Sequence, residues 1–325
     1  MILVTGGAGF IGSVLVKELN YRGYSNIIIV DRLESDEKWK NLRKLDYIDY
    51  IHADILFEQS DDSFWENVEY IYHMGACSST TENDVDYLWA NNVLYSRELF
   101  NIAAEYNIPF VYASSAATYG DGELGYDDSH EKIRSLMPLN PYGFSKHIFD
   151  KWIFQQEKKP QKWFGLKFFN VFGPNEYHKG DMRSLVHKGF HQIQNDGQVK
   201  LFKSHRPDYK DGEQLRDFVY VKDVVKASIS LGESKDEGIS GIYNIGTGES
   251  RTFLDLIKAT FVAMEKEENI VFVDMPENIR HQYQYYTQAN MDKLKKALPF
   301  FQFMSLEAAV KDYVTQHLQV KDSYL

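Results

Sequence analysis

The feature that most constrains this chain is a glycine-rich stretch at its start, Ile2-Leu-Val-Thr-Gly-Gly-Ala-Gly-Phe-Ile-Gly12. It joins a short apolar run to a segment whose apolar residues recur at helical spacing. In a strand–turn–helix unit, glycines at such spacings let the backbone turn tightly and approach a diphosphate at the helix N-terminus. We therefore expect a dinucleotide to contact Gly6, Gly9, Phe10, Ile11 and Gly12.

The alternation of apolar runs and helical patterns in the first half of the chain predicts a parallel sheet. Short β-branched runs alternate with helical patterns over residues 1–169, as in sheets covered by helices. Ligands collect at the carboxyl ends of such strands, where this chain has Asp31, Met74–Ser79 and Ser114–Thr118. The expected elements are strands at Ile2–Thr5, Ile27–Val30, Tyr70–His73 and Pro109–Ser114, and a helix at Ile11–Tyr21.

After Asn170 the segments become longer and richer in loops, with interspersed basic and aromatic residues. The sequence thus predicts an α/β chain with two parts. Residues 1–169 form a Rossmann-type doubly wound parallel sheet that binds NADP, and residues 170–325 form a smaller, interleaved α/β substrate domain. We expect residues 217–236 to return to the first part.

Charge and cysteine content narrow the functional classes. A net charge of −11 argues against a nucleic-acid partner, which would need a basic face. Cys77 is the one cysteine, so no intramolecular disulfide is expected. The chain lacks an apolar run near the roughly 18 residues of a membrane helix, and the early glycine turn leaves no room for a cleavable leader. We expect a cytoplasmic protein without a membrane segment. His73, His178 and His187 lack metal-ligand spacing, so no metal is predicted.

Asp31 lies at the end of the second expected strand, 19 residues after Gly12. A carboxylate there usually binds the adenosine ribose and favours NAD. Arg32 and Lys38, however, place two cations at the same corner, which suits a 2′-phosphate unless both are solvated surface charges. We favour NADP as the cofactor, with NAD possible.

Tyr142 and Lys146 stand four residues apart in Tyr-Gly-Phe-Ser-Lys, on one face of an expected helix. The ammonium group, together with a positive nicotinamide, would favour the phenolate and lower the tyrosine pKa. Tyr142 could then accept a hydroxyl proton as hydride leaves the carbon. Such a pair is common by chance, but Ser115 or Thr118 at a strand end could hydrogen-bond the reacting oxygen.

Serine, tyrosine and lysine in this order behind a glycine-rich turn resemble the extended short-chain dehydrogenase/reductase superfamily over essentially the whole chain. Arg216–Asp223 and Tyr243–Gly248 are also similar to family segments. The resemblance implies a homo-oligomer that acts on a small molecule. It also implies further cofactor contacts from Met74, Gly75, Ala76, Cys77, Ser78, Asn91, Lys146, Val171 and Lys179.

Epimerases, dehydratases and reductases of nucleotide-activated sugars all occur in this superfamily, so the fold does not choose among them. Gly75–Glu82, Ala113–Gly120, Phe168–Gly180 and Tyr283–Gln288 are most similar to epimerases that oxidise an exocyclic carbinol and return the hydride to the other face. Such an epimerase uses two bases. Tyr142 matches the first and Lys179 the second, although without the family context Lys179 could be a phosphate-binding or surface lysine.

The substrate contacts are likewise implied by the resemblance, with Arg216 matching the nucleotide diphosphate. Two departures stand out. Met74 replaces a common carboxylate, and Asp181 replaces a small hydroxyl residue, which adds negative charge beside Lys179. Lys188 stands where a substrate-contacting histidine is usual. The implied set is Ser115, Asn170, Asp181, Lys188, Phe202, Lys203, Ser204, His205, Arg216 and Tyr283.

Other activities remain open at this point. An epimerase acting at C4 of a UDP-hexose would share the Tyr142–Lys146 pair but would not need Lys179. A 4,6-dehydratase usually carries an Asp-Glu pair where this chain has Ala116 and Ala117. A non-catalytic NADP-binding sensor commonly lacks the tyrosine or the lysine, and both are present.

Overall fold

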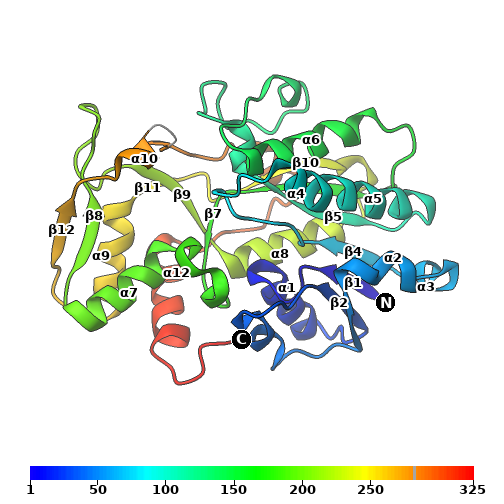
Figure 1. Cartoon of the computed structure of the whole chain (residues 1–325), viewed down its shortest axis with the longest axis horizontal. Coiled ribbons are helices and arrows are strands. Elements are labelled where there is room, and N and C mark those ends of the chain that lie inside the picture. Colours follow the sequence, from blue (N-terminus) through cyan, green and yellow to red (C-terminus); the bar gives the residue numbers. More distant parts are fainter. Residues whose placement is uncertain (281–282) are drawn as a thin grey trace.

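The computed structural model describes residues 1–280 and 283–325, and its centre is a seven-stranded sheet in the order β10-β6-β5-β4-β1-β2-β3 (Figure 1). Every pairing in it is parallel. Strands β1, β2, β6 and β10 are buried along their whole length, because helices cover both faces of a parallel sheet. The bounds are β1 Ile2–Thr5, β2 Ile27–Asp31, β3 Asp49–His52, β4 Tyr70–His73, β5 Phe110–Ser115, β6 Trp163–Phe168 and β10 Gly241–Ile245.

Two layers of helices enclose this sheet, which confirms the predicted doubly wound α/β fold. Helices α1 (Phe10–Tyr21) and α8 (Val221–Gly232) pack on each other below the sheet, and α5 (Tyr95–Glu105) and α6 (Pro141–Gln155) lie above it in the view of Figure 1. Two apolar cores result, one on each side of the sheet.

A second lobe holds the smaller sheets and lies at the left of Figure 1. Its sheets have the orders β11-β9-β7 and β12-β8. The strand bounds are β7 Asn170–Phe172, β8 Val199–Phe202, β9 Leu215–Tyr220, β11 Ser250–Thr252 and β12 Ile270–Val273. The helices of this part of the chain are α7 Leu185–Asp196, α9 Phe253–Ala263, α10 Glu277–Arg280, α11 Asp292–Ala297 and α12 Leu306–Tyr313.

Short helices connect these elements. In the sheet lobe they are η1 Glu37–Leu42, η2 Ala53–Ile55, α2 Leu56–Gln59, α3 Asp62–Glu66, α4 Val85–Leu88, η3 Trp89–Leu94, η4 Ala116–Tyr119 and η5 Ile133–Ser135. Further along the chain are η6 Tyr177–Met182, η7 Glu237–Ile239 and η8 Val314–Leu318. Within the described residues, no helix combines the length and apolar character needed to cross a membrane.

The segment that returns to the first lobe differs from the expected 217–236. Residues 217–220 belong to β9, which pairs with β7 and β11 in the second lobe. Helix α8 then packs on α1, and β10 pairs with β6, so the returning segment extends to Ile245. From β1 the chain first adds β2 and β3 on one side and then crosses to add β4, β5 and β6 on the other. The switch point therefore lies between β1 and β4, and ligands bind at the carboxyl ends of strands at such a point.

Candidate active site

At Gly6 and Gly12 of the turn after β1, neighbouring backbone lies so near that a side chain would not fit. Gly6 has φ of +66°, and a Cβ there would lie 2.5 Å from the Gly75 nitrogen at the end of β4. A Cβ on Gly12 would collide with the Gly6 carbonyl oxygen. Because Gly9 is the N-cap of α1 and offers no capping side chain, the first N–H groups of the helix are left for an anion. The turn therefore fits a dinucleotide diphosphate.

A cleft of about 820 Å³ runs from this turn to α6. A smaller cavity of about 210 Å³ shares Gly6, Asp31, Lys38 and Gly75–Cys77 with it. All the residues predicted to bind the cofactor line one or both of these cavities. Those that line the large cleft are Gly6, Gly9, Phe10, Ile11, Gly12, Asp31, Lys38, Met74, Gly75, Ala76, Cys77, Ser78, Lys146, Val171 and Lys179, and Arg32 and Asn91 line the small cavity.

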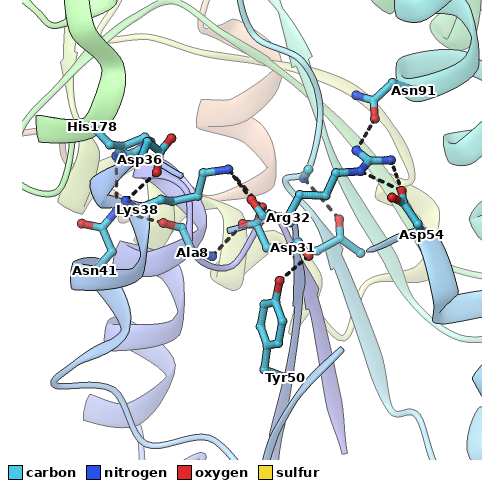
Figure 2. A network of polar contacts seen from close by, with 12 residues as sticks. Ala8, Asp31, Arg32, Asp36, Lys38, Asn41, Tyr50, Asp54, Asn91 and His178 are labelled. Atoms are coloured by element: carbon cyan, nitrogen blue, oxygen red, sulfur yellow. Dashed lines mark hydrogen bonds and ion pairs between the residues drawn. The ribbon is translucent and has the colours of Figure 1, made fainter. Parts of the chain in front are cut away.

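Asp31 is held from several sides, as Figure 2 shows. Its Oδ2 accepts a hydrogen bond from the Ala8 N–H (2.9 Å), and its Oδ1 lies 3.3 Å from Lys38 Nζ. Lys38 also donates to the Arg32 carbonyl oxygen (2.8 Å). Asp31 thus links the glycine turn to Lys38. Its carboxylate stands at the end of β2, where an adenosine ribose would lie.

Arg32 is fixed by two partners on the wall of the small cavity (Figure 2). Its Nε donates to Asp54 Oδ1 (2.7 Å) and its Nη1 to Asn91 Oδ1 (2.6 Å). The hydrogen bond from Arg32 lowers the pKa of Asp54. Arg32 and Lys38 line this cavity together with Asp31 and Glu34, so the corner combines two cations with two carboxylates.

The loop after β4 is tied to α6 by Asn92, a residue that the sequence analysis missed. The Asn92 amide accepts from the Cys77 N–H (2.9 Å) and donates to the Cys77 carbonyl oxygen (3.0 Å). It also donates to Ser145 Oγ (3.0 Å), which in turn donates to the Tyr142 carbonyl oxygen (2.7 Å). Asn92 lies in η3, a π-helical turn of the kind often found at functional sites.

Tyr142 and Lys146 are both buried on α6 and line the large cleft. Asn140 caps this helix by accepting from the Gly143 N–H (2.7 Å). Lys146 Nζ donates to the Ala113 carbonyl oxygen (2.9 Å), and burial lowers the pKa of Lys146 to about 8. The expected effect on the tyrosine is not found in the chain alone. Burial raises the pKa of Tyr142, opposed by a hydrogen bond with Ser115.

Ser115 lines the cleft, whereas Thr118 belongs to a buried network behind it. Thr118 Oγ1 donates to the Ser115 carbonyl oxygen (2.7 Å) and accepts from Lys167 Nζ. Lys167 lies 2.8 Å from Asp150 Oδ2, and both side chains are fully buried. Asp150 is on α6, so this ion pair joins α6 to β6, and through Thr118 to the turn that carries Ser115.

Lys179 reaches the same cleft from η6 in the second half of the chain. Its Nζ donates to Ser78 Oγ (3.3 Å), and burial lowers its pKa, opposed by the Glu176 carboxylate. Asp181 does not act as expected. It is exposed outside the cleft lining and does not contribute to the Lys179 pKa, and its carbonyl oxygen accepts from Lys188 Nζ (2.6 Å). Lys188 also lies outside the cleft lining.

Arg216 and Tyr283 line the far end of the cleft with Asn170. The Arg216 guanidinium lies 5.2 Å from the centre of the Tyr283 ring, and burial lowers the Arg216 pKa. The predicted wall Phe202–His205 lies outside the cleft lining. It reaches the site only indirectly, because His205 Nδ1 bonds Tyr285 (2.8 Å), whose ring packs on Tyr283.

Comparison with known proteins agrees with this geometry. Residues 2–246 match the family described as "NAD dependent epimerase/dehydratase family". Over its full length the chain is 50% identical to the whole ADP-L-glycero-D-manno-heptose-6-epimerase of Fusobacterium nucleatum. It is 48% identical to the whole protein of the same name from Nitratidesulfovibrio vulgaris.

Among solved structures, the ADP-L-glycero-D-manno-heptose-6-epimerase of Helicobacter pylori has a TM-score of 0.80 at 27% identity, covering 98% of this chain and 96% of that one. The UDP-glucose 4-epimerase of Thermotoga maritima, solved with UDP-glucose, has a TM-score of 0.77 at 26% identity and covers 96% of this chain and 97% of that one.

Proposed function

This chain belongs to the NAD dependent epimerase/dehydratase family, and from that premise we propose that it converts ADP-D-glycero-D-manno-heptose to ADP-L-glycero-D-manno-heptose. The carbinol at C6″ is oxidised to a ketone and the hydride returns to the opposite face. Support comes from the full-length relatives of that name, at 50% and 48% identity, and from the resemblance of residues 75–82 and 168–180 to the same enzyme.

The observation that carries the proposal is the presence of Lys179 in the same cleft as Tyr142. Inversion by oxidation and return needs a proton acceptor for one alcohol epimer and a proton donor for the other. Tyr142 reaches the cleft from α6, beside Ser115, while Lys179 reaches it from η6, beside Ser78. Because burial lowers the pKa of Lys179, this amine is closer to the range in which it can exchange a proton at neutral pH.

Each residue then has a definite task. A nicotinamide bound along the cleft would supply the acceptor and donor of the C6″ hydride. Tyr142 takes the hydroxyl proton of one epimer, and Ser115 hydrogen-bonds the same oxygen. Lys179 gives a proton to that oxygen when the other epimer forms, and the roles reverse in the opposite direction. Lys146 would hold the nicotinamide ribose, and its charge would favour the Tyr142 phenolate.

The family takes a nicotinamide cofactor, and we propose that the form bound here is NADP. Arg32 and Lys38 support this choice, since both line the small cavity beside Asp31. Arg216 is proposed to bind the ADP diphosphate as a guanidinium fork does, with Asn170 and Tyr283 at the sugar end. From the superfamily resemblance and the single cysteine, we further propose a cytoplasmic homo-oligomer.

A UDP-hexose 4-epimerase is the alternative, because its solved relative from Thermotoga maritima shares the fold at 26% identity. The experiment that separates the two uses purified protein without added cofactor. We expect the co-purified dinucleotide to be NADP⁺ and the two ADP-heptose epimers to interconvert. Activity on UDP-glucose and none on the ADP-heptoses would overturn the substrate assignment.

The two-base part is tested with Lys179→Met, which should lower the rate of epimerisation by at least about 100-fold, in the range of general acid–base contributions. Lys200→Met is the matched control, because Lys200 is exposed on β8 and outside the cleft. Near-native epimerisation in Lys179→Met would show that a different residue is the second base.

A further inference from the structure

The segment Asp322–Leu325 crosses from the second lobe to the cofactor side of the molecule. In Figure 1 the red trace runs from the lower left back to the dark blue elements, where the mark C lies beside α1 and β2. Ser323, Tyr324 and Leu325 are half-buried there, and Leu325 packs against the larger apolar core. This segment has no part in the chemistry described above, yet its contacts lie on both sides of the cleft.

One set of contacts is with the residues that lead to Lys179. Tyr177, two positions before it, donates through its hydroxyl to the Ser323 carbonyl oxygen (2.8 Å), and its ring meets the Tyr324 ring edge-on at 4.9 Å. The Leu325 N–H donates to Asn175 Oδ1 (3.1 Å). The segment is therefore held by Tyr177, the first residue of η6, and by Asn175, two residues before it.

The other set is with the end of η1, the short helix that carries Lys38. Arg43 Nη2 lies 3.0 Å from Asp322 Oδ1, and the Arg43 guanidinium lies 5.0 Å from the centre of the Tyr324 ring. Lys44 Nζ donates to the Tyr324 carbonyl oxygen (2.7 Å) and lies 3.1 Å from Asp322 Oδ2. The segment thus joins η1 to η6 from the outside.

Asn175 completes the connection from the inside. It is fully buried with φ of +71°, a conformation that costs a non-glycine residue free energy unless its surroundings hold it. Its Nδ2 donates to Ser13 Oγ on α1 (2.9 Å), and its carbonyl oxygen accepts from Asn41 Nδ2 (3.3 Å). Asn41 also donates to the Ala8 carbonyl oxygen of the glycine turn (2.9 Å).

From these contacts we propose that the 322–325 segment is a positioning element that fixes where Lys179 stands relative to the cofactor-binding turn. The proposal rests on the proposed function of Lys179 as the second base. Its ion pairs are exposed and each contributes little to global stability. We expect these contacts to affect the rate of reaction more than stability, since displacing a reacting group by about 1 Å can cost about 100-fold in rate.

The test compares Tyr324→Ala with Tyr324→Phe, which keeps the ring that touches Tyr177 and Arg43. Tyr21→Ala is the matched control, because Tyr21 on α1 is also an aromatic residue with a cation, Lys17, over its ring (5.4 Å). We expect Tyr324→Ala to lower epimerisation about tenfold or more. Tyr324→Phe and Tyr21→Ala should stay within about twofold of the unmodified protein, and all three should unfold at nearly the same temperature.

A stereochemical readout separates positioning from general damage. The protein, loaded with NADPH deuterated at the transferred position, is mixed with an ADP-sugar analogue that carries an aldehyde at C6″. The C6″ alcohol then records which face received deuterium. Unmodified protein should give both stereoisomers, Lys179→Met should lose one, and Tyr324→Ala should be depleted in that same one.

A second readout does not depend on turnover. Amide hydrogen exchange of residues 175–182 should accelerate in Tyr324→Ala without cofactor, because the Lys179 N–H bonds only the Glu176 carbonyl oxygen within that local turn. Native exchange and a native product ratio in Tyr324→Ala would overturn the positioning role. Retention of both stereoisomers by Lys179→Met would instead overturn the second-base assignment, so the two failures are distinguishable.

Discussion

At the scale of single residues, Lys146 has an environment that makes the reaction sensitive to pH. Its ammonium group is buried on α6 with one backbone acceptor, and burial lowers its pKa to about 8 from the ordinary 10.5. Protonated Lys146 supports the phenolate of Tyr142, whereas neutral Lys146 does not. The proton that matters for catalysis is therefore lost near the upper end of the physiological range.

We expect kcat to fall as pH rises through about 8. The effect on stability has the opposite sign. Between pH 8 and about 10.5, the ordinary pKa of a lysine, the unfolded chain keeps the proton that the folded chain has released, so this group's contribution to stability rises with pH over that window. Lys146→Arg should lose the alkaline limb of the kcat profile, because a guanidinium stays charged. An unchanged limb in that variant would assign it to another group.

Several residues singled out by local spacing lie together in the structure. Gly6, Gly12, Asp31, Tyr142 and Lys146 all line the large cleft, and their roles there stay predictions. Asn92 gave no such signal, since its partners Cys77 and Ser145 lie far from it in sequence. The raised pKa of Tyr142 was also out of reach, because burial is a property of the folded chain.

At the scale of elements, the buried Asp150–Lys167 pair is the joint between α6, β6 and the turn carrying Ser115. Tyr112 and Ser114 donate to the same carboxylate at 2.9 and 2.8 Å, which satisfies it away from water. A buried ion pair of this kind is costly to break, since removing one partner leaves an unpaired charge.

Lys167→Met should therefore lower the free energy of unfolding by roughly 3–5 kcal/mol, measured by urea denaturation. Adding Asp150→Asn to it should restore part of that loss, because no charge is then left buried alone. Thr118→Val removes the hydrogen bonds to the Ser115 carbonyl oxygen and from Lys167 but keeps the Asp150–Lys167 ion pair, so it should lower stability less than Lys167→Met while still reducing kcat. If the double variant is no more stable than Lys167→Met, the unpaired Asp150 charge is not the cause of the loss of stability.

Elements with strong periodicity were predicted closely, and weak ones were not. The strands at Ile2–Thr5 and Tyr70–His73 have the expected bounds, and the helix starts one residue earlier than expected, at Phe10. Strand β3 was missed, because of its four residues only Ile51 is buried and an edge strand lacks the apolar run of a central one.

At the scale of the whole molecule, the chain passes from the first lobe to the second and back again, and the returning segment extends beyond the expected residue 236 to Ile245. Helix α8 covers α1, and β10 completes the sheet beside β6, although both come after β9 of the second lobe. The apolar residues of α8, such as Val224 and Ile229, are fully buried in the same core as Val14 and Leu15 of α1.

A fragment of residues 1–169 should consequently fail to fold alone. It would expose the face of α1 that α8 covers and leave β6 as an open edge, which favours association with other chains. We expect aggregation or dye binding to exposed apolar surface and no native near-ultraviolet dichroism, whereas the full chain unfolds cooperatively. A soluble, folded fragment that binds NADP⁺ would show that the first lobe is independent.

Contacts between segments far apart in the sequence determine the features of the whole molecule that the sequence alone did not predict. The positions of Phe202–His205 and of the 322–325 segment depend on which distant surfaces they meet, and no local pattern encodes that. The change of pattern near Asn170 indicated two interleaved parts and a return of the chain to the first, but the bounds of the returning segment depend on the packing of α8 on α1 and of β10 on β6.

The corner formed by Asp31, Arg32 and Lys38 is already held by Asp54, Asn91 and backbone groups in the chain alone. A ligand that enters a preorganised corner loses little further freedom in the protein, so it is retained well. An enzyme that keeps its cofactor and returns every hydride makes no net demand on the cell's reducing equivalents. The direction of its reaction is then set by the ratio of the two sugar epimers and does not depend on the cell's ratio of oxidised to reduced nicotinamide cofactor.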